Sequence, residues 1–140
     1  MIINGENLLL GRLASFAAKK ALLGEEIIIV NSEKVVVSGK KPMVFRYFKA
    51  KIERGNVFKG PFVSRMPDQI VRRAVRGMLP YKKERGRKAF KRVKCYIGIP
   101  KEYANKKYEA IEDANIKNLS TPYHIKIGTI STLLGKEKRW

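Results

Sequence analysis

The 140-residue sequence contains a single cysteine, Cys95, and a single histidine, His124. One cysteine cannot form an internal disulfide, so the sequence suits a reducing compartment. A zinc site built from cysteine and histidine needs several such ligands, and they are not there. We therefore expect no metal and no other cofactor. We interpret Cys95 as an inert strand residue and His124 as a surface or packing residue.

Long hydrophobic runs are also missing. No apolar stretch approaches the ~20 residues that a membrane-spanning helix needs. The first thirty residues lack the basic start, apolar stretch and small-residue cleavage site of a secretory signal, which predicts a cytoplasmic protein. Hydrophobic residues still make up 44% of the chain, which is enough to build one core. We expect one domain over residues 1–140, with residues 104–140 as a C-terminal extension.

Acidic residues are few, and they are fewest relative to basic residues in one segment of the chain. The chain has 31 Lys and Arg against 12 Asp and Glu, a formal net charge of +19. Residues 1–39 hold four basic and four acidic side chains, whereas residues 40–94 hold 19 basic and three acidic ones. Residues 95–140 hold eight basic and five acidic side chains. Nearly all of the excess positive charge therefore lies in the middle segment.

Such a concentration of like charge destabilises a fold through self-repulsion unless a polyanion neutralises it. Nucleic acid is the commonest partner of this kind, because neutralised phosphates release condensed counterions. One alternative is a highly soluble basic protein without a fixed partner. An anionic membrane is another, but membrane-surface helices need a broad uncommitted apolar face, and here the apolar faces are needed for packing.

Motifs of catalysis are absent as well. Ser38-Gly39-Lys40-Lys41 resembles the end of a phosphate-binding loop, but Lys34 stands where that motif needs glycine and Lys41 where it needs serine or threonine. No G-x-G-x-x-G follows an expected strand, and most acidic residues are scattered singly. We therefore expect no enzyme activity and no small-molecule substrate.

The opening third of the chain has an α/β pattern. A strand at Ile2-Ile3 ends at Asn4-Gly5, and a helical repeat from Leu10 to Ala21 follows, with Gly24 as its stop. The β-branched run 27–30 predicts a buried strand, and 35–37 a further one. Strand, helix and strand in this order predict a parallel pair with a right-handed crossover.

The middle segment predicts three helices. The first covers 42–52 and is expected to turn Met43, Tyr47 and Ala50 inward. An extended basic stretch at 56–65 leads to a second helix that begins at Pro67, where proline suits the first position. Gly77 and Pro80 end it, and a third helix covers 83–92. A strand at 95–99 follows.

The second and third of these helices carry cationic faces opposite their apolar ones. Arg72, Arg73 and Arg76 form the cationic face of the second helix, and Arg85, Lys88 and Arg92 form that of the third. Charged faces of this kind cannot be buried without partners, and the arginine fork matches phosphate oxygens. Two solvated helix faces are the plainer interpretation, but Glu84 is the only acidic residue close to them. RNA phosphates are thus the favoured partner.

Aromatic residues are interleaved with these cations and could stack on unpaired bases. We assign Phe45, Phe48 and Phe90 to the core, while contact with RNA and core packing are equally open for Phe62 and Tyr81. In the last forty residues we expect mostly connection, with helical fragments at 103–110 and 130–134.

Several motifs resemble those of one family. The stretch Val75-Arg76-Gly77-Met78-Leu79-Pro80, then Arg85-Gly86 and Arg92-Val93-Lys94, resembles the signature of the universal large-subunit ribosomal protein thirteen. Residues 10–15 and Ser38-Gly39 match that family too. Residues 60–62 and 98–100, with Arg65 and Pro67, are similar to its archaeal and eukaryotic branch. The resemblance covers roughly residues 2–103.

The resemblance implies a three-layer α/β/α fold on a mainly parallel four-stranded sheet, with the basic helices on one side. It also implies a non-catalytic structural protein of the large ribosomal subunit that binds large-subunit ribosomal RNA beside neighbouring ribosomal proteins and joins early in assembly. The RNA-binding positions that it implies are Arg72, Arg73, Arg76, Lys82, Lys83, Arg85, Arg87 and Lys88. Less central candidates are Arg12, Lys40, Lys41 and Arg65.

Two other functions are compatible with the same charge pattern. A free RNA-binding regulatory or RNA-modifying factor would remain outside ribosomes on a sucrose gradient. A general DNA-compacting protein would bind duplex DNA and RNA equally well in competition.

Overall fold

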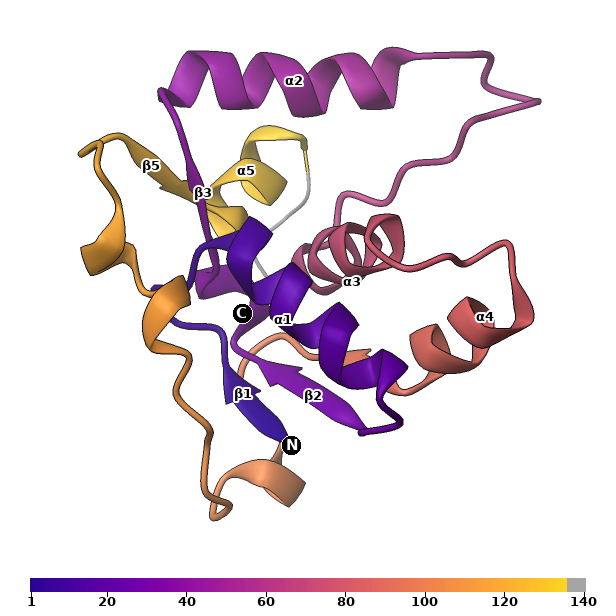
Figure 1. The fold of residues 1–140 in the computed structure, drawn as a ribbon. Coiled ribbons are helices and arrows are strands. Elements are labelled where there is room, and N and C mark those ends of the chain that lie inside the picture. Colours follow the sequence, from indigo (N-terminus) through magenta and orange to yellow (C-terminus); the bar gives the residue numbers. More distant parts are fainter. Residues whose placement is uncertain (136–140) are drawn as a thin grey trace.

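The computed structural model describes residues 1–135 of the chain. These residues form a mixed α/β fold with five helices, a parallel sheet of three strands and a small antiparallel sheet of two (Figure 1). The last five residues of the expected C-terminal extension, 136–140, lie outside the described part. None of the helices within residues 1–135 is long and apolar enough to cross a membrane.

The parallel sheet contains β1 (Ile2–Asn4), β2 (Ile27–Val30) and β4 (Val93–Cys95), in the order β1-β2-β4. Helix α1 (Leu10–Leu22) makes the crossover between β1 and β2. In the register, Ile3 lies opposite Ile29 and Ile27 lies opposite Val93. The expected parallel β-α-β unit is confirmed.

The main core lies between this sheet and three helices. Helix α1 contributes Leu13 and a row of alanines that is almost completely buried: Ala14, Ala17, Ala18 and Ala21. Because alanine side chains are short, the backbones of neighbouring helices can approach α1 closely. Both α3 (Pro67–Gly77) and α4 (Glu84–Lys91) pack against it. The alanine row therefore determines how closely the two basic helices are held to the sheet.

The second sheet was only half expected. Strand β3 (Val36–Ser38) agrees with the expected strand at 35–37, but it pairs antiparallel with β5 (His124–Lys126), outside the parallel sheet. Helix α5 (Ile127–Leu133) follows β5 directly. The expectation of helical fragments alone in the tail was wrong: only the one near 130–134 is present, and β5 was missed. Residues 103–110 contain no α-helix, and a single 3-10 turn covers Lys101–Tyr103.

Helix α2 (Lys41–Glu53) lies over the second sheet and α5 (Figure 1). The expected inward face of this helix was wrong, because Met43, Tyr47 and Ala50 are all exposed. The side chain that is buried is Val44, which packs with Ile125 of β5, Ile130 of α5 and Leu134. The covered face was set by tail residues that are about eighty positions away in sequence.

Strand β4 also begins earlier than the sequence predicted. The expected strand at 95–99 shares only Cys95 with the observed one. Pairing with β2 starts at Val93, opposite Ile27, and the backbone after Cys95 leaves the regular ladder. The register with a neighbouring strand, rather than the local apolar run, decides where this strand lies.

Candidate RNA-binding surface

Helix α3 is anchored by its apolar side. Pro67 occupies its first position and is buried, and Asp68 lies in the first turn, where a negative charge favours the helix dipole. Ile70, Val71 and Val75 are buried in the core. The helix ends at Gly77, as predicted, and leaves Met78 exposed. The opposite side of α3 is therefore free to carry charge.

Helix α4 is held by a close backbone contact at Gly86. A Cβ atom added there would lie 2.1 Å from the carbonyl oxygen of Pro80 and 2.3 Å from its carbon. Such distances are far inside van der Waals contact, so only glycine fits. The turn that joins α3 to α4 thus lies directly on the α4 backbone. This contact holds the α3–α4 turn against the first turn of α4.

The far end of α4 is tied to α1. The guanidinium of Arg92, which follows α4, donates a hydrogen bond to the carbonyl oxygen of Ala21 at 3.2 Å. A cation at this position also interacts favourably with the negative, C-terminal end of the α1 dipole. Ala89 and Val93 are buried, and Phe90 is partly buried against the core. Arg92 therefore acts within the fold and belongs to its scaffold.

Six of the expected RNA-binding cations are exposed on α3, α4 and the turn between them: Arg73, Lys82, Lys83, Arg85, Arg87 and Lys88. We call these six residues the α3–α4 surface. Within residues 1–135, only Lys88 of this set forms an ion pair, with Glu84 at 2.7 Å. Both side chains of that pair are exposed, and exposed pairs contribute about 0–1 kcal/mol. The surface therefore keeps most of its positive charge uncompensated by nearby carboxylates.

Two more of the expected cations, Arg72 and Arg76, are half-buried against aromatic rings. The guanidinium carbon of Arg72 lies 4.6 Å from the ring centre of Phe90, and that of Arg76 lies 5.1 Å from the ring centre of Tyr81. The Nε atom of Arg72 is buried without a hydrogen-bond partner. Arg72 thus contributes to packing between α3 and α4, whereas Arg76 lines an open cleft.

The four less central candidates lie elsewhere. Arg12 on α1 donates a hydrogen bond to the carbonyl oxygen of Asp113 at 2.6 Å and so ties the tail to the domain. Lys40 and Lys41 begin α2 beside β3, and Lys40 lies 5.4 Å from the ring centre of Tyr123. Arg65 accepts a hydrogen bond at its carbonyl oxygen from the buried Ser131 hydroxyl, at 2.6 Å. The structure does not bring these four together with α4.

Cys95 and His124 do not form a reactive site. Burial raises the pKa of the Cys95 thiol to about 12, so the thiol stays protonated at neutral pH. His124 lies exposed on β5, where its Nδ1 atom contacts the carbonyl oxygen of Pro122 at 3.0 Å. Among residues 1–135 no cluster of His, Cys, Asp and Glu could hold a metal ion.

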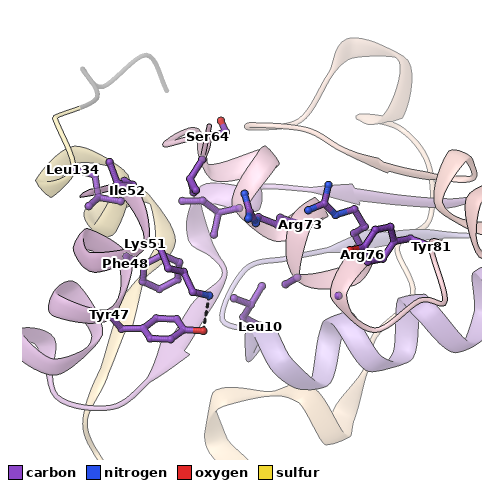
Figure 2. Close-up of a pocket in the computed structure, with 14 residues that line it drawn as sticks. Leu10, Tyr47, Phe48, Lys51, Ile52, Ser64, Arg73, Arg76, Tyr81 and Leu134 are labelled. Carbon is purple, nitrogen blue, oxygen red and sulfur yellow. Dashed lines mark hydrogen bonds between the residues drawn. The ribbon is translucent and has the colours of Figure 1, made fainter. Parts of the chain in front are cut away.

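The structure also reveals a cleft that the sequence did not predict. A hollow of about 390 Å³ separates α2 from α3 (Figure 2). Tyr47 and Lys51 of α2 line one wall, and Arg73, Arg76 and Tyr81 line the other. The apolar lining includes Leu10, Phe48, Ile52, Ile70, Ala74 and Leu134. The cleft therefore combines aromatic rings, cations and an apolar base, without a carboxylate.

Sequence reasoning missed Lys51 altogether and assigned Tyr47 to the core. The i, i+4 spacing of these two residues was the available signal, because residues four apart on a helix are neighbours. In the structure the ammonium of Lys51 lies 4.0 Å from the ring centre of Tyr47 and donates a hydrogen bond to its hydroxyl. The question left open for Phe62 and Tyr81 is also answered, because their side chains are 77% and 43% exposed. Neither is a core residue.

Comparison with known proteins places this geometry in context. The family model of ribosomal protein L13 matches residues 1–102. The large ribosomal subunit protein uL13 of Methanopyrus kandleri is 46% identical over 136 residues, which cover 96% of this chain and 86% of that protein. The protein of the same name from Methanosphaera stadtmanae is 44% identical over 138 residues, or 96% of each chain. That from Archaeoglobus fulgidus is 43% identical over 135 residues, covering 96% of this chain and 86% of the relative.

Proposed function

Because the chain belongs to the ribosomal protein L13 family, we propose that it is a structural constituent of the large ribosomal subunit that binds large-subunit ribosomal RNA. Its partners are that RNA and the neighbouring ribosomal proteins, and it is located in the large subunit. The family is a structural one, and the chain is a ribosomal protein rather than an enzyme. Early entry into subunit assembly is part of the proposal and rests on the family resemblance.

The α3–α4 surface is the observation that carries the RNA-binding proposal. Its six cations project from α3, from α4 and from the turn that the Gly86 contact holds against α4, and five of them have no ion-pair partner within residues 1–135. A rigid positive surface can contact a folded sugar–phosphate backbone without changing its own shape on binding. Contacts of this kind position RNA and do not read its sequence. The proposed function is therefore to clamp folded RNA.

A neighbouring loop supports burial of this side of the molecule in a larger particle. Val57, Phe58 and Phe62 are 85%, 89% and 77% exposed, which is unusual for large apolar side chains. They lie between Arg54 and Arg65, a segment without acidic residues. We infer that the segment is covered in the assembled subunit.

Reversal of three arginines tests the proposal. The variant with Arg73, Arg85 and Arg87 changed to Glu should bind large-subunit RNA at least about a hundredfold more weakly, since charge-assisted contacts contribute roughly 1.5–3 kcal/mol each. Its circular dichroism should match that of the unchanged protein, because all three side chains are exposed. Arg72 is left in place because its contact with Phe90 serves the fold.

The matched control reverses three exposed lysines outside the basic segment: Lys19, Lys101 and Lys117. Both variants have the same net charge, so a general effect of charge lowers both affinities equally. Equal weakening would refute the α3–α4 surface as the binding site. A chain that sediments apart from large subunits at moderate salt would support a free regulatory or modifying factor instead.

We also infer the finer arrangement that the resemblance implies, a three-layer α/β/α fold with four parallel strands. A parallel bridge between Ile3 and Glu109 supports a fourth position beside β1, where the Glu109 amide donates to the carbonyl oxygen of Ile2 at 2.8 Å. Slow amide exchange at Glu109, as slow as within β2, would agree with this arrangement, and exchange at the rate of an open loop would contradict it.

A further inference from the structure

The cleft between α2 and α3 has a composition that differs from the open α3–α4 surface beside it. Its interior lining is mainly apolar, while its rim carries two tyrosines and three cations. A phosphate backbone alone gains nothing from an apolar base. A nucleotide that has left its helix needs an apolar or aromatic place for the base and a cation for the phosphate. The cleft offers both within one hollow.

We propose that this cleft binds an unpaired nucleotide of the RNA, with the base between the tyrosine rims and the phosphate at Arg73. The inference rests on the proposed function and adds a binding mode to it. Figure 2 shows the two walls, with Tyr47 and Lys51 facing Arg73, Arg76 and Tyr81 across the hollow.

The two tyrosines are presented at the surface in a defined orientation. Tyr47 is 58% exposed and is held by Lys51 from the next turn of α2. Tyr81 is 43% exposed, and Arg76 lies against its ring at 5.1 Å. A ring that is already held in place loses little conformational freedom when a base stacks on it. Each rim therefore forms a prepared stacking platform.

The size and charge of the cleft agree with a nucleotide. About 390 Å³ lies within the range of roughly 300–1,000 Å³ found for small-ligand sites. No aspartate or glutamate lines it, so a phosphate meets no like charge there. Arg73 is exposed at the mouth and belongs to the α3–α4 surface, so the strand that it holds continues onto α4.

A comparison of two short RNAs isolates the base from the backbone. The probes are a single-stranded hexauridine and the same strand with its two central positions made abasic, each titrated with the full chain by fluorescence anisotropy. Base stacking on aromatic side chains predicts roughly five- to a hundredfold tighter binding of the strand that keeps its bases. Changing Tyr47 or Tyr81 to Leu should bring this ratio toward one.

The matched control is Tyr123→Leu. Tyr123 is 55% exposed and has a lysine at 5.4 Å from its ring centre, so it resembles Tyr47 in both respects but does not line the cleft. Its replacement should leave the ratio unchanged. A ratio near one in the unchanged protein, or a ratio that the Tyr47 and Tyr81 variants do not alter, overturns the inference.

These outcomes separate the two proposals. If the abasic strand still binds and the arginine reversals still weaken it, the clamp stands and only the base site fails. If neither strand binds but large-subunit RNA still does, the base site fails and the clamp stands. If large-subunit RNA does not bind either, the clamp itself fails. A cleft filled by a segment of a neighbouring protein is the competing outcome, in which lysine-directed cross-linking of purified large subunits joins Lys51 to that protein.

Discussion

Residues 1–39 and residues 40–94 are both built from amphipathic helices and short strands, but they place their charges differently. In the first region basic and acidic residues are equal in number, and two of its lysines have partners within the region, Lys20 with Glu25 and Lys34 with Glu6. In the second region, 19 basic residues face three acidic ones. The first region can neutralise itself, and the second depends on a partner.

The difference separates two tasks along one chain. The first region supplies β1, α1 and β2 entirely, and its buried alanines hold the basic helices close to the sheet. The second region supplies the cations and leaves them outside. A loss of packing in the first region should therefore reduce stability, whereas a loss of charge on the exposed α3–α4 surface should reduce binding alone.

The largest effect should come from the core of the first region. Leu13 is completely buried on α1 beneath the basic helices. Changing Leu13 to Ala should lower the free energy of unfolding by about 2–5 kcal/mol, because it removes buried methyl groups and leaves a cavity. Urea denaturation measures the loss. The folded fraction of this variant should keep its RNA affinity. If that affinity falls as far as in the variant with three reversed arginines, the proposed separation of tasks is wrong.

A smaller effect is expected at the contact that holds the α3–α4 turn against α4. Changing Gly86 to Ala forces the Cβ atom into the Pro80 backbone and should cost about 1–3 kcal/mol or more of stability. Gly77→Ala is the matched control, since a Cβ atom there meets nothing within 4 Å. Thermal unfolding of both variants checks the difference. Equal stability would show that the turn does not need this close approach.

Cys95 should give the smallest effect at neutral pH. Its pKa is raised from 9.0 to about 12 by burial, so the folded chain should react slowly with iodoacetamide and the unfolded chain quickly. Below pH 9 the thiol is protonated in both states and contributes no pH dependence. Between pH 9 and about 12 the unfolded state loses the proton first, so stability should fall. Cys95→Ser should remove that part of the fall.

The α/β order of the first region could be predicted because its signals are local. The periodicity of α1, the stop at Gly24 and the buried run of β2 each lie within one element. The inward face of α2 could not, because β5 and α5 cover it from the other end of the chain. The strand β5 itself has only three residues, too few for an alternating pattern to stand out.

The candidate site shows the same limit. The exposure of Arg73, Arg85 and Lys88 followed from helical spacing and the lack of nearby acids, whereas the other three cations of the α3–α4 surface were implied only by the family resemblance. The stacking of Arg72 on Phe90 depends on how α3 and α4 meet, which spacing within one helix does not specify. The cleft needed the relative position of α2 and α3, joined by a long extended segment. Both features belong to tertiary packing.

The salt dependence of RNA affinity tests the central claim most directly. If the six cations of the α3–α4 surface each neutralise one phosphate, the logarithm of affinity should fall against the logarithm of salt concentration with a slope of about −5. Changing Lys82 and Lys83 to Glu should make that slope shallower by about two, and the same change at the exposed pair Lys106 and Lys107 should leave it unaltered. A slope near zero, or equal shifts for both pairs, would contradict an RNA clamp built on the α3–α4 surface.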